Sequence, residues 1–496
     1  MRPYLSSSAV LCAALLAACN DGRTPADVVN APAAGSLAHS VSGGPTVNFV
    51  SNVTNDTTAQ NETPLAVNPT NSQNFITGNN DWNYNDGCGV NATLNGGKTW
   101  TKTLPSGFIP GITKYTNDPT VAGIGVYDFG GDPAVAFDPN GVAYFACFGY
   151  QGTPPYNVVL LLSRSFDGGR TWLKGPPSEP LTQVSVFQGN GVTRGSTGQF
   201  ADHEAMTIGS DGTIYVTWAQ FHGYGYSSPV WVGTANVADK SLKFTTVQVS
   251  SGTTQSNQDQ RIAVTPDGST AFLTFDNYVL GTGATAMFVS TSTDHGKSWS
   301  PASQFGSIQD PVCLFPPYCF NISGGQFRGP GSYPAPAYNP ANNRLYVAYA
   351  DIVGGKGQIF LTSASATDLA KWSAPAVVAA NTAGDRFAAE LGIASNGRID
   401  LAFYDRGYTG NQLVDVTYAT SSDAGATWSS ARVSKSSFDP SLWGVPSGSG
   451  IRPFIGDYNG IVSLPTSAGL TWTGAGTKNY GALNTNLEIY FGSVSP

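Results

Sequence analysis

An eight-residue block, Ser-x-Asp-x-Gly-x-Thr-Trp, recurs along this chain and constrains its fold more than any other feature. The block is complete at residues 165–172 and 421–428, carries one change at 292–299 and two at 93–100, and keeps only its ends at 365–372. Each copy follows an apolar run and precedes another short strand-like segment, so we expect each to be a hairpin turn. Such repetition is typical of a modular array of β units.

The residue types of the block explain how such a turn would form. The Asp carboxylate can accept hydrogen bonds from turn N–H groups, and the Gly adopts a positive φ without steric cost. The Trp ring buries a large apolar surface and anchors the turn to its own module. We interpret the block as structural, because acid–base chemistry would need its Asp in a cleft and not in a solvent-side turn.

A second, weaker repeat lies upstream of each block and consists of a strand, a polar turn and another strand, as at residues 133–146 and 334–349. Together with the strands that flank the block, it gives four strands per module. The fourth strands of six modules are expected to start near Trp100, Trp172, Leu242, Trp299, Trp372 and Trp428.

A seventh module follows residue 450 but ends without a fourth strand, and the segment 46–50 is expected to supply it. Such closure leaves no free sheet edge. The sequence therefore predicts an all-β fold over residues 46–496, a seven-bladed β-propeller of four-stranded antiparallel blades. A six-bladed propeller is the alternative, if the last segment is only half a blade.

Composition narrows the class of protein. Charged residues make up 11% of the chain and there are 59 glycines, which is typical of a loop-rich extracytoplasmic β protein. The formal net charge of −8 argues against nucleic acid as a partner, because phosphate binding needs a basic stripe. We expect a monomer without a cofactor.

The N-terminus has the pattern of a targeting segment. Arg2 precedes an apolar run over residues 9–18, which is short for a membrane span and typical of a signal peptide. The end of this run, Leu-Ala-Ala-Cys, resembles the bacterial lipobox. We therefore expect 1–19 to be a lipoprotein-type signal peptide and Cys19 to be lipidated, with an ordinary secretory signal as the alternative. Residues 20–45 are expected to form a flexible tether, which would place the protein in a bacterial cell envelope, lipid-anchored to a membrane or secreted.

Four cysteines remain beyond the signal segment, and an exported chain with four cysteines suggests two disulfides. Cys313 and Cys319 most simply pair with each other as a small loop. Cys88 would then pair with Cys147 in the neighbouring module. No metal site is predicted, because the cysteine spacings match no zinc pattern and the chain has 4 His residues.

The Trp blocks resemble the Asp-boxes, or BNR repeats, of the sialidase (neuraminidase) superfamily. The chain from about residue 46 is similar to bacterial sialidase-like repeat proteins, and the pair Asp405-Arg406 and the segment 454–460 are similar to segments of such proteins. The resemblance implies a propeller, of six blades if it is of sialidase type, that binds a carbohydrate or glycoconjugate. It also implies a glycosidase activity of the exo-sialidase kind, although a shared fold does not decide function.

Propellers usually bind ligands at one end of the central axis, where the inner strands begin and the second strands end. Polar and aromatic residues recur there about once per module and suggest a funnel for a hydroxyl-rich or charged ligand. Those near the starts of the inner strands include Glu62, Asp132, Asp202, His203, Glu204, Asp259, Arg261, Tyr333, Asp385, Arg386 and Arg452. Those after the second strands include Asp81, Asp276, Asp351, Asp405 and Arg406.

The resemblance implies a role for several of these residues. A sialidase site holds the sialate carboxylate with three Arg residues and uses a Tyr nucleophile activated by a Glu, with an Asp as the acid. In this chain the matching candidates are Arg261, Arg386 and Arg452 for the clamp, Tyr458 or Tyr333 for the nucleophile, Glu204 for its activator and Asp81 for the acid, with Tyr333, Asp405 and Arg406 also facing the substrate. One position departs from the family, because Glu62 stands where its first Arg is expected, and its charge would repel a sialate carboxylate.

Two further functions stay open on this sequence. The first is a surface propeller that binds a ligand or a protein without catalysis. The second is a polysaccharide lyase in which Tyr333 and His203 would abstract a proton. A titrating His or a carboxyl with a raised pKa in the funnel would favour an enzyme, whereas a funnel covered by its own segment 305–332 would favour a scaffold.

Overall fold

The computed structural model of the chain describes residues 43–55, 59–82, 88–101, 111–114, 125–172, 183–190, 198–222, 227–251, 256–279, 284–309, 332–378, 384–442, 444–447, 450–476 and 486–496. The predicted signal peptide with Cys19, most of the predicted tether, and the predicted Cys313–Cys319 pair lie outside the described residues. No described helix is long and apolar enough to cross a membrane.

Seven antiparallel sheets surround one axis, which confirms the seven-bladed propeller and shows that the six-bladed alternative is wrong. Blades 1 and 2 consist of β2 (Gln60–Asn61), β3 (Leu65–Asn68), β4 (Asn71–Asp81) and β5 (Gly89–Thr93), and of β6 (Phe129–Phe137), β7 (Ala143–Tyr150), β8 (Val158–Ser165) and β9 (Gln183–Gly189). Blades 3 and 4 consist of β10 (Gln199–Ile208), β11 (Thr213–His222), β12 (Val230–Asn236) and β13 (Thr245–Gln248), and of β14 (Asn257–Val264), β15 (Ala271–Val279), β16 (Ala284–Ser292) and β17 (Ser303–Ile308).

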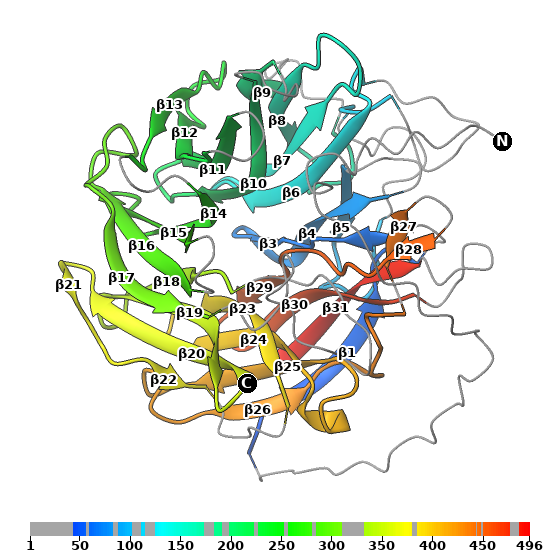
Figure 1. Cartoon of the computed structure of the whole chain (residues 1–496), viewed down its shortest axis with the longest axis vertical. Helices are drawn as coiled ribbons and strands as arrows, with labels where there is room; N and C mark the ends of the chain where they lie inside the picture. The colour runs from blue at the N-terminus through cyan, green and yellow to red at the C-terminus, as the bar shows by residue number, and fades with distance from the viewer. Residues whose placement is uncertain are drawn as a thin grey trace.

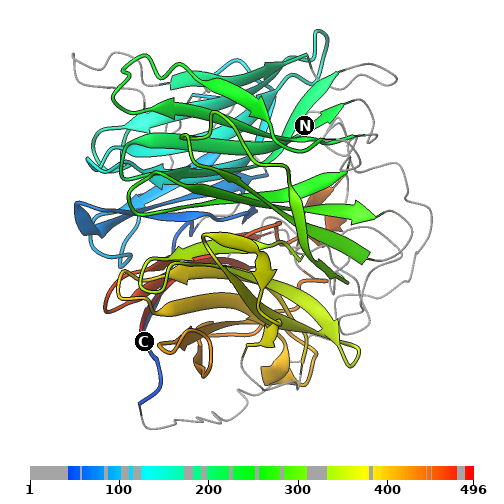
Figure 2. The same cartoon turned by 90° about the vertical axis from the view of Figure 1, so that its left-hand side faces the viewer.

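Blades 5 and 6 continue the ring. They consist of β18 (Ala335–Asn339), β19 (Arg344–Val353), β20 (Lys356–Ser365), β21 (Asp368–Trp372) and β22 (Ala376–Val377), and of β23 (Arg386–Ile393), β24 (Ile399–Asp405), β25 (Asp415–Ser421) and β26 (Ser429–Arg432). A 3-10 turn η2 (Gly407–Thr409) follows β24, and a hairpin of β27 (Val445–Ser447) and β28 (Gly450–Arg452) precedes the last blade. Figure 2, turned from Figure 1, shows the green and yellow outer strands of blades 4 and 5 facing the viewer.

The last blade combines the two ends of the chain. It consists of β29 (Gly460–Ser463), β30 (Ala468–Ala475) and β31 (Leu487–Ser495), and β1 (Thr46–Asn52) pairs antiparallel with β31 as its outer strand. Figure 1 shows the blue β1 beside the red β31. This confirms the predicted closure, which joins the edges of the first and last segments through backbone hydrogen bonds.

The hydrophobic core lies between adjacent blades. β8 is buried along its whole length and begins with the continuous apolar run 158–162, as expected for a strand whose two faces both pack against neighbouring blades. Between blades 1 and 2, one cluster joins Ile76 of β4, Phe145 of β7 and Trp172 of a turn block. The disulfide Cys88–Cys147 crosses the same boundary, as predicted.

The Trp blocks form the turns between third and fourth strands. In blade 2, Asp167 Oδ1 accepts the N–H groups of Thr171 (2.9 Å) and Arg170 (3.1 Å), and Gly169 has a φ of 90°. Since successive strands reverse direction, these turns lie at the opposite end of the propeller from the starts of the inner strands. This geometry is consistent with a structural role for the Trp blocks. A ligand site at the axial end would lie at the other end of the propeller from these turns.

Candidate functional site

The inner strands share a distortion at the end where they begin. In five of the seven blades, one non-glycine residue near the start of the inner strand has a positive φ. At or just after this residue, the pairing between the inner strand and the second strand is interrupted by a bulge. These residues are Glu62 (60°), Asp132 (52°), His203 (55°), Asp259 (60°) and Ala388 (57°). A bulge re-aims the side chains around it, and strained backbone of this kind concentrates at functional sites. The distortion therefore makes the axial end a candidate site.

Residues at or near these bulges form polar contacts that connect each blade to the next around the axis. In blade 1, Asn80 Oδ1 accepts the N–H of Asp132 at 2.9 Å. Asp132 Oδ2 accepts the N–H of His203 at 2.8 Å. His203 Nδ1 lies 2.8 Å from the carboxylate of Asp259 in blade 4. These three contacts link four successive blades, blades 1 to 4, through side chains that can also take part in chemistry.

The same chain of contacts continues through blades 5 to 7. The guanidinium of Arg261 lies 5.2 Å from the ring centre of Tyr333, within cation–π range. The Tyr333 hydroxyl donates to Glu390 Oε1 at 2.5 Å. The same oxygen accepts the backbone N–H of Asn459 at 3.2 Å. Glu390 is thus held by one side-chain donor and one backbone donor.

Tyr458 ties the two halves together across the axis. Its hydroxyl donates to the carbonyl of Pro133 in blade 2 at 2.9 Å, and its own carbonyl accepts the N–H of Thr63 in blade 1 at 3.2 Å. Its ring lies 5.0 Å from the Arg261 guanidinium and 5.2 Å from the His203 ring centre. Arg261 is therefore in contact with two tyrosine rings. We call the following residues the axial ring: Asn80, Asp132, His203, Asp259, Arg261, Tyr333, Glu390 and Tyr458.

Two buried carboxyl groups of this region, those of Asp132 and Glu204, have raised pKa values. Burial, and then the charges of Glu62, Asp202 and Glu204, raise the pKa of Asp132 well above its usual range, against the His203 N–H, which lowers it. Burial also raises the pKa of Glu204 well above its usual range, although nearby backbone N–H groups act against this rise. Strongly perturbed carboxyls beside specific charge partners are typical of functional sites.

Glu390 has a different environment from Asp132. Burial raises its pKa, but Arg261, the Tyr333 hydroxyl and the Asn459 N–H act in the opposite direction because they favour the ionised form. Asp132, Arg261 and Glu390 are half-buried, whereas the side chain of Tyr333 is only 1% exposed. A ligand at the axis would therefore reach the two carboxyls and the guanidinium before the phenol.

The structure brings together only part of the predicted site. Arg261, Tyr333, Tyr458, Glu204 and His203 gather at the axial end, as described above. Of the two tyrosines predicted as the nucleophile, Tyr458 donates to a backbone carbonyl, and Tyr333 donates to Glu390 and not to the predicted Glu204. The burial of Tyr458 raises the pKa of its phenol well above the usual range, and no contact that we observe assigns it a base.

Three other candidates lie within blade 6. Arg386 Nε donates to Asp405 Oδ2 at 3.0 Å, and Arg406 Nη1 donates to Asp385 Oδ2 at 2.8 Å, with both guanidinium groups buried. These reciprocal ion pairs join the start of β23 to the end of β24. The guanidinium groups of Arg386 and Arg406 are therefore already engaged by carboxylates of their own blade.

Two further candidates are not part of the axial ring. Asp81 is buried at the end of β4, in register with Gln60 of β2. Arg452 ends β28, and its side chain lies outside the part of the chain that the structure describes. Roles in catalysis or binding for Asp81 and Arg452 stay predictions.

Glu390 was not predicted from the sequence to belong to the site. It lies in β23, Arg-Phe-Ala-Ala-Glu-Leu-Gly-Ile, where every residue after Arg386 apart from Glu390 is apolar or glycine. An acidic residue within such a run is the signal that would have indicated a functional carboxyl. Asp132 and Asp259 were noted as funnel residues, but without a partner. Among the described residues, no group of three or more His, Cys, Asp or Glu side chains is arranged to hold a metal ion.

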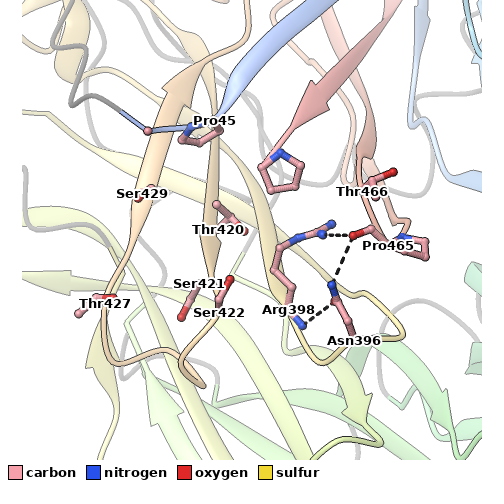
Figure 3. Close-up of a pocket in the computed structure, with 12 residues that line it drawn as sticks. Pro45, Asn396, Arg398, Thr420, Ser421, Ser422, Thr427, Ser429, Pro465 and Thr466 are labelled. Carbon is pink, nitrogen blue, oxygen red and sulfur yellow. Dashed lines mark hydrogen bonds between the residues drawn. The ribbon is translucent and has the colours of Figure 1, made fainter.

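A hollow of about 570 Å³ lies at the opposite end of the molecule, beside the turn block of blade 6 (Figure 3). Ser421, Thr427 and Arg398 line it. The Arg398 guanidinium donates to Asp400 (2.9 Å) and to the carbonyl of Pro465 (2.8 Å), so its charge is already compensated. The axial ring, with its strained backbone and perturbed carboxyls, is the stronger candidate site.

No family model matches the chain, and no curated protein matches its sequence. Among solved structures, it is similar to a protein of unknown function from Dyadobacter fermentans, with 13% identity over 91% of this chain and 99% of the other and a TM-score of 0.45. It is also similar to the GH93 α-L-arabinofuranosidase of Fusarium graminearum in complex with arabinobiose (10% identity, 91% and 98% covered, TM-score 0.45). A third is the α-L-arabinanase of Penicillium chrysogenum complexed with arabinobiose (14% identity, 72% and 92% covered, TM-score 0.42). Likenesses at this level leave the function to be argued from the axial ring itself.

Proposed function

We propose that the axial ring is the active site of a glycoside hydrolase, with Asp132 as the general acid and Glu390 as the ionised carboxylate. The observation that carries the proposal is the difference between these two carboxyl environments. Glycosidases generally use two carboxyls, one that keeps its proton and one that stays ionised, and neighbouring groups set the two roles.

Asp132 has the properties of the acid. The burial of its carboxyl and the nearby Glu62 and Asp202 favour the protonated form. One of its oxygens accepts the His203 N–H, and the side chain remains half-buried and not closed off. A proton held there can be donated to the oxygen of a leaving group.

Glu390 has the properties of the second carboxylate. Arg261 lies near enough to favour its ionised form, and the Tyr333 hydroxyl and the Asn459 N–H hold one of its oxygens in place. Glu390 then acts as nucleophile or as base toward water, and the configuration of the released sugar distinguishes the two. Tyr333 is a positioning residue in this scheme and not the nucleophile, because its side chain is buried behind Glu390.

The finer proposal of a sialidase has less support. Of the arginines predicted for a three-residue clamp, Arg261 lies at the axis, while Arg386 is paired with Asp405 inside blade 6. Glu62, at the position of the family's first Arg, interacts electrostatically with Asp132 and Tyr458. A hydrolase for a sugar without a carboxylate fits these residues better.

A panel of fluorogenic aryl glycosides tests the activity, with a neutral arm that includes an α-L-arabinofuranoside and an anionic arm that includes a sialoside. We expect Asp132→Asn and Glu390→Gln each to lower kcat/KM by about 100-fold or more, and Tyr333→Phe by about tenfold. Asp267→Asn, an exposed carboxyl at the opposite end, is the matched control and should have no effect.

Two outcomes would overturn the hydrolase. One is release of the fluorophore that neither Asp132→Asn nor Glu390→Gln affects. The other is binding of sugars without release from any glycoside in the panel, which would favour the non-catalytic binding propeller.

We also propose that the protein works outside the cytoplasm, anchored through Cys19 or secreted. The disulfide Cys88–Cys147 supports this, since such bonds persist in oxidising compartments. Metabolic labelling with a fatty acid tests the anchor: label should enter the wild type and not a Cys19→Ala variant, and equal labelling of both would contradict it.

A further inference from the structure

His203 lies at the bulge of β10, and its backbone contacts the carboxyl that we assign as the general acid. The pairing of β10 with β11 is interrupted between Asp202 and Ala205, and a bulge leaves its extra residue out of the ladder. The His203 N–H donates instead to Asp132 Oδ2 of the preceding blade, at 2.8 Å. His203 therefore holds one oxygen of the Asp132 carboxyl through its backbone.

The backbone conformation that makes this contact is held from the next blade. His203 has a φ of 55°, which is unfavourable for a residue with a Cβ atom and persists where the surroundings enforce it. Its Nδ1 lies 2.8 Å from Asp259 Oδ1, and its carbonyl accepts a hydrogen bond from Gln260 Nε2. The inner strands of the three blades involved, β6, β10 and β14, are neighbours around the axis (Figure 1).

The contact with Asp259 is the polar anchor of the His203 ring. The two side chains are 6% and 7% exposed, so water competes little for this contact. His203 Nε2 is buried and has no hydrogen-bond partner in the part of the chain that the structure describes. The ring also packs against the ring of Tyr458, with 5.2 Å between the centres. Loss of the Asp259 side chain would therefore remove the polar contact that fixes the direction of the ring.

We propose that His203 is a positioning residue for the general acid: its side chain, paired with Asp259, holds the left-handed backbone that directs the His203 N–H at Asp132. The proposal rests on the hydrolase function above and adds two residues to it. Because Oδ2 accepts the N–H, Oδ1 is left to carry the proton for the leaving group. A donor to a carboxylate also favours its ionised form, so the contact sets how readily Asp132 releases that proton.

Other ionisable groups act on both residues and decide which comparison is needed. Those that act on Asp132 are Glu62, Asp202, Glu204 and Tyr458, and those that act on His203 are Asp259, Arg261, Asp457 and Glu390. Because the His203 imidazole also titrates, the step that belongs to Asp132 is the one that Asp132→Asn removes.

NMR of the full chain, isotope-labelled at the backbone nitrogen of histidine, tests the contact without turnover. The chain has 4 His residues, so there are few amide signals, and His203→Asn identifies the one from His203. We expect this amide proton to move to low field in a titration step above pH 3.8, as Asp132 ionises, and Asp132→Asn to abolish the step. Asp259→Gly removes the side chain but permits the positive φ, and it should reduce the step by about half or more.

His295 is a matched control in the same spectrum. It also has a positive φ, of 61°, and its Nδ1 lies 2.9 Å from Asp211 Oδ2, but it belongs to a turn block at the opposite end of the propeller. Its amide should keep the same titration in Asp132→Asn and in Asp259→Gly.

The pH dependence of kcat/KM on a cleaved aryl glycoside tests the consequence for catalysis. His203→Ala should lower kcat/KM by about tenfold and move its alkaline limb to higher pH, because Asp132 loses a donor that favours its ionised form. His203→Asn should recover most of the loss, since Asn tolerates a positive φ and its amide can still donate to Asp259. His295→Ala should leave the rate and the profile unchanged.

Three outcomes would overturn the positioning role. These are a wild-type His203 amide without a step that depends on Asp132, a step that Asp259→Gly leaves at full size, and a pH profile that His203→Ala leaves unchanged. The first is decided even if Asp259→Gly or His203→Ala does not fold. Each can occur while Asp132→Asn and Glu390→Gln still abolish turnover, so the hydrolase would stand. The expected titration steps, without cleavage of any glycoside, would support the hold of His203 and Asp259 on the Asp132 carboxyl and overturn the hydrolase.

Discussion

Replacement of Arg406 by methionine separates a structural role from a role in substrate binding. Arg406 is fully buried, and its Nη1 donates to Asp385 Oδ2 at 2.8 Å. Methionine fills most of the same space without a charge. The Asp385 carboxylate then stays buried. Among the hydrogen bonds that we observe, the one that this carboxylate still accepts is from the backbone N–H of Gly357, at 3.0 Å. Breaking one side of a buried ion pair costs about 3–5 kcal/mol, and we expect the free energy of unfolding to fall by that amount.

Urea unfolding followed by tryptophan fluorescence measures the change, and a double-mutant cycle assigns it to the pair. Asp385→Asn should also destabilise the protein, and the double variant should lose less than the sum of the two single losses by about 0.5–3 kcal/mol. Sugar binding and turnover, measured well below the unfolding transition, should stay at the wild-type level. An Arg406→Met protein that is as stable as the wild type but no longer binds or cleaves sugars would refute the reasoning and restore the predicted substrate contact.

Three further predictions concern other parts of the molecule. Burial and neighbouring carboxyls raise the pKa of Asp132 well above 3.8, so the folded state keeps a proton that the unfolded chain releases. The free energy of unfolding should therefore fall as pH rises from about 4 through the folded-state pKa. In a pH series of urea titrations, Asp132→Asn should make this fall smaller. Replacing Cys88 and Cys147 together by alanine opens a loop with a sequence separation of 59 and should lower the free energy of unfolding by about 4 kcal/mol. A variant with unchanged stability in urea would contradict the idea that the disulfide restricts the unfolded chain. Asp167→Ala removes the acceptor of the Thr171 and Arg170 N–H groups and should lower the free energy of unfolding in urea by about 1–3 kcal/mol, while glycoside turnover persists. A loss of turnover without a loss of stability would give the Trp blocks a role in function.

The architecture followed closely from the repeats. The blocks of Asp, Gly and Trp encode a local turn, and a turn forms from contacts within a few residues. Their spacing gave the module length, and the missing strand of the last module predicted that β1 would pair with β31. The disulfide between Cys88 and Cys147 also followed, because neighbouring modules place their strands side by side.

The site followed only in part. The sequence indicated which end of each module carries polar residues, because strand direction alternates along a module. It expected Glu204 to be the partner of Tyr458 or Tyr333, whereas Tyr333 donates to Glu390. It also placed Arg406 in contact with the substrate, although that side chain is neutralised within its own blade. Pairing depends on the direction in which each side chain leaves a bulged strand, and no local pattern reports that direction.

The sequence by itself determined the class of fold and favoured seven blades closed by the N-terminal strand, since each of these is a sum of local patterns repeated along the chain. The structure decided between seven blades and six. Only the tertiary structure decided which groups meet at the axis. Asp132 and His203 are 71 positions apart, and Tyr458 reaches Pro133 across 325 positions. Such contacts arise when separate blades are packed around one axis and their inner strands are bent by strained residues. The free energy that holds them comes from burial between blades, which no single module contains.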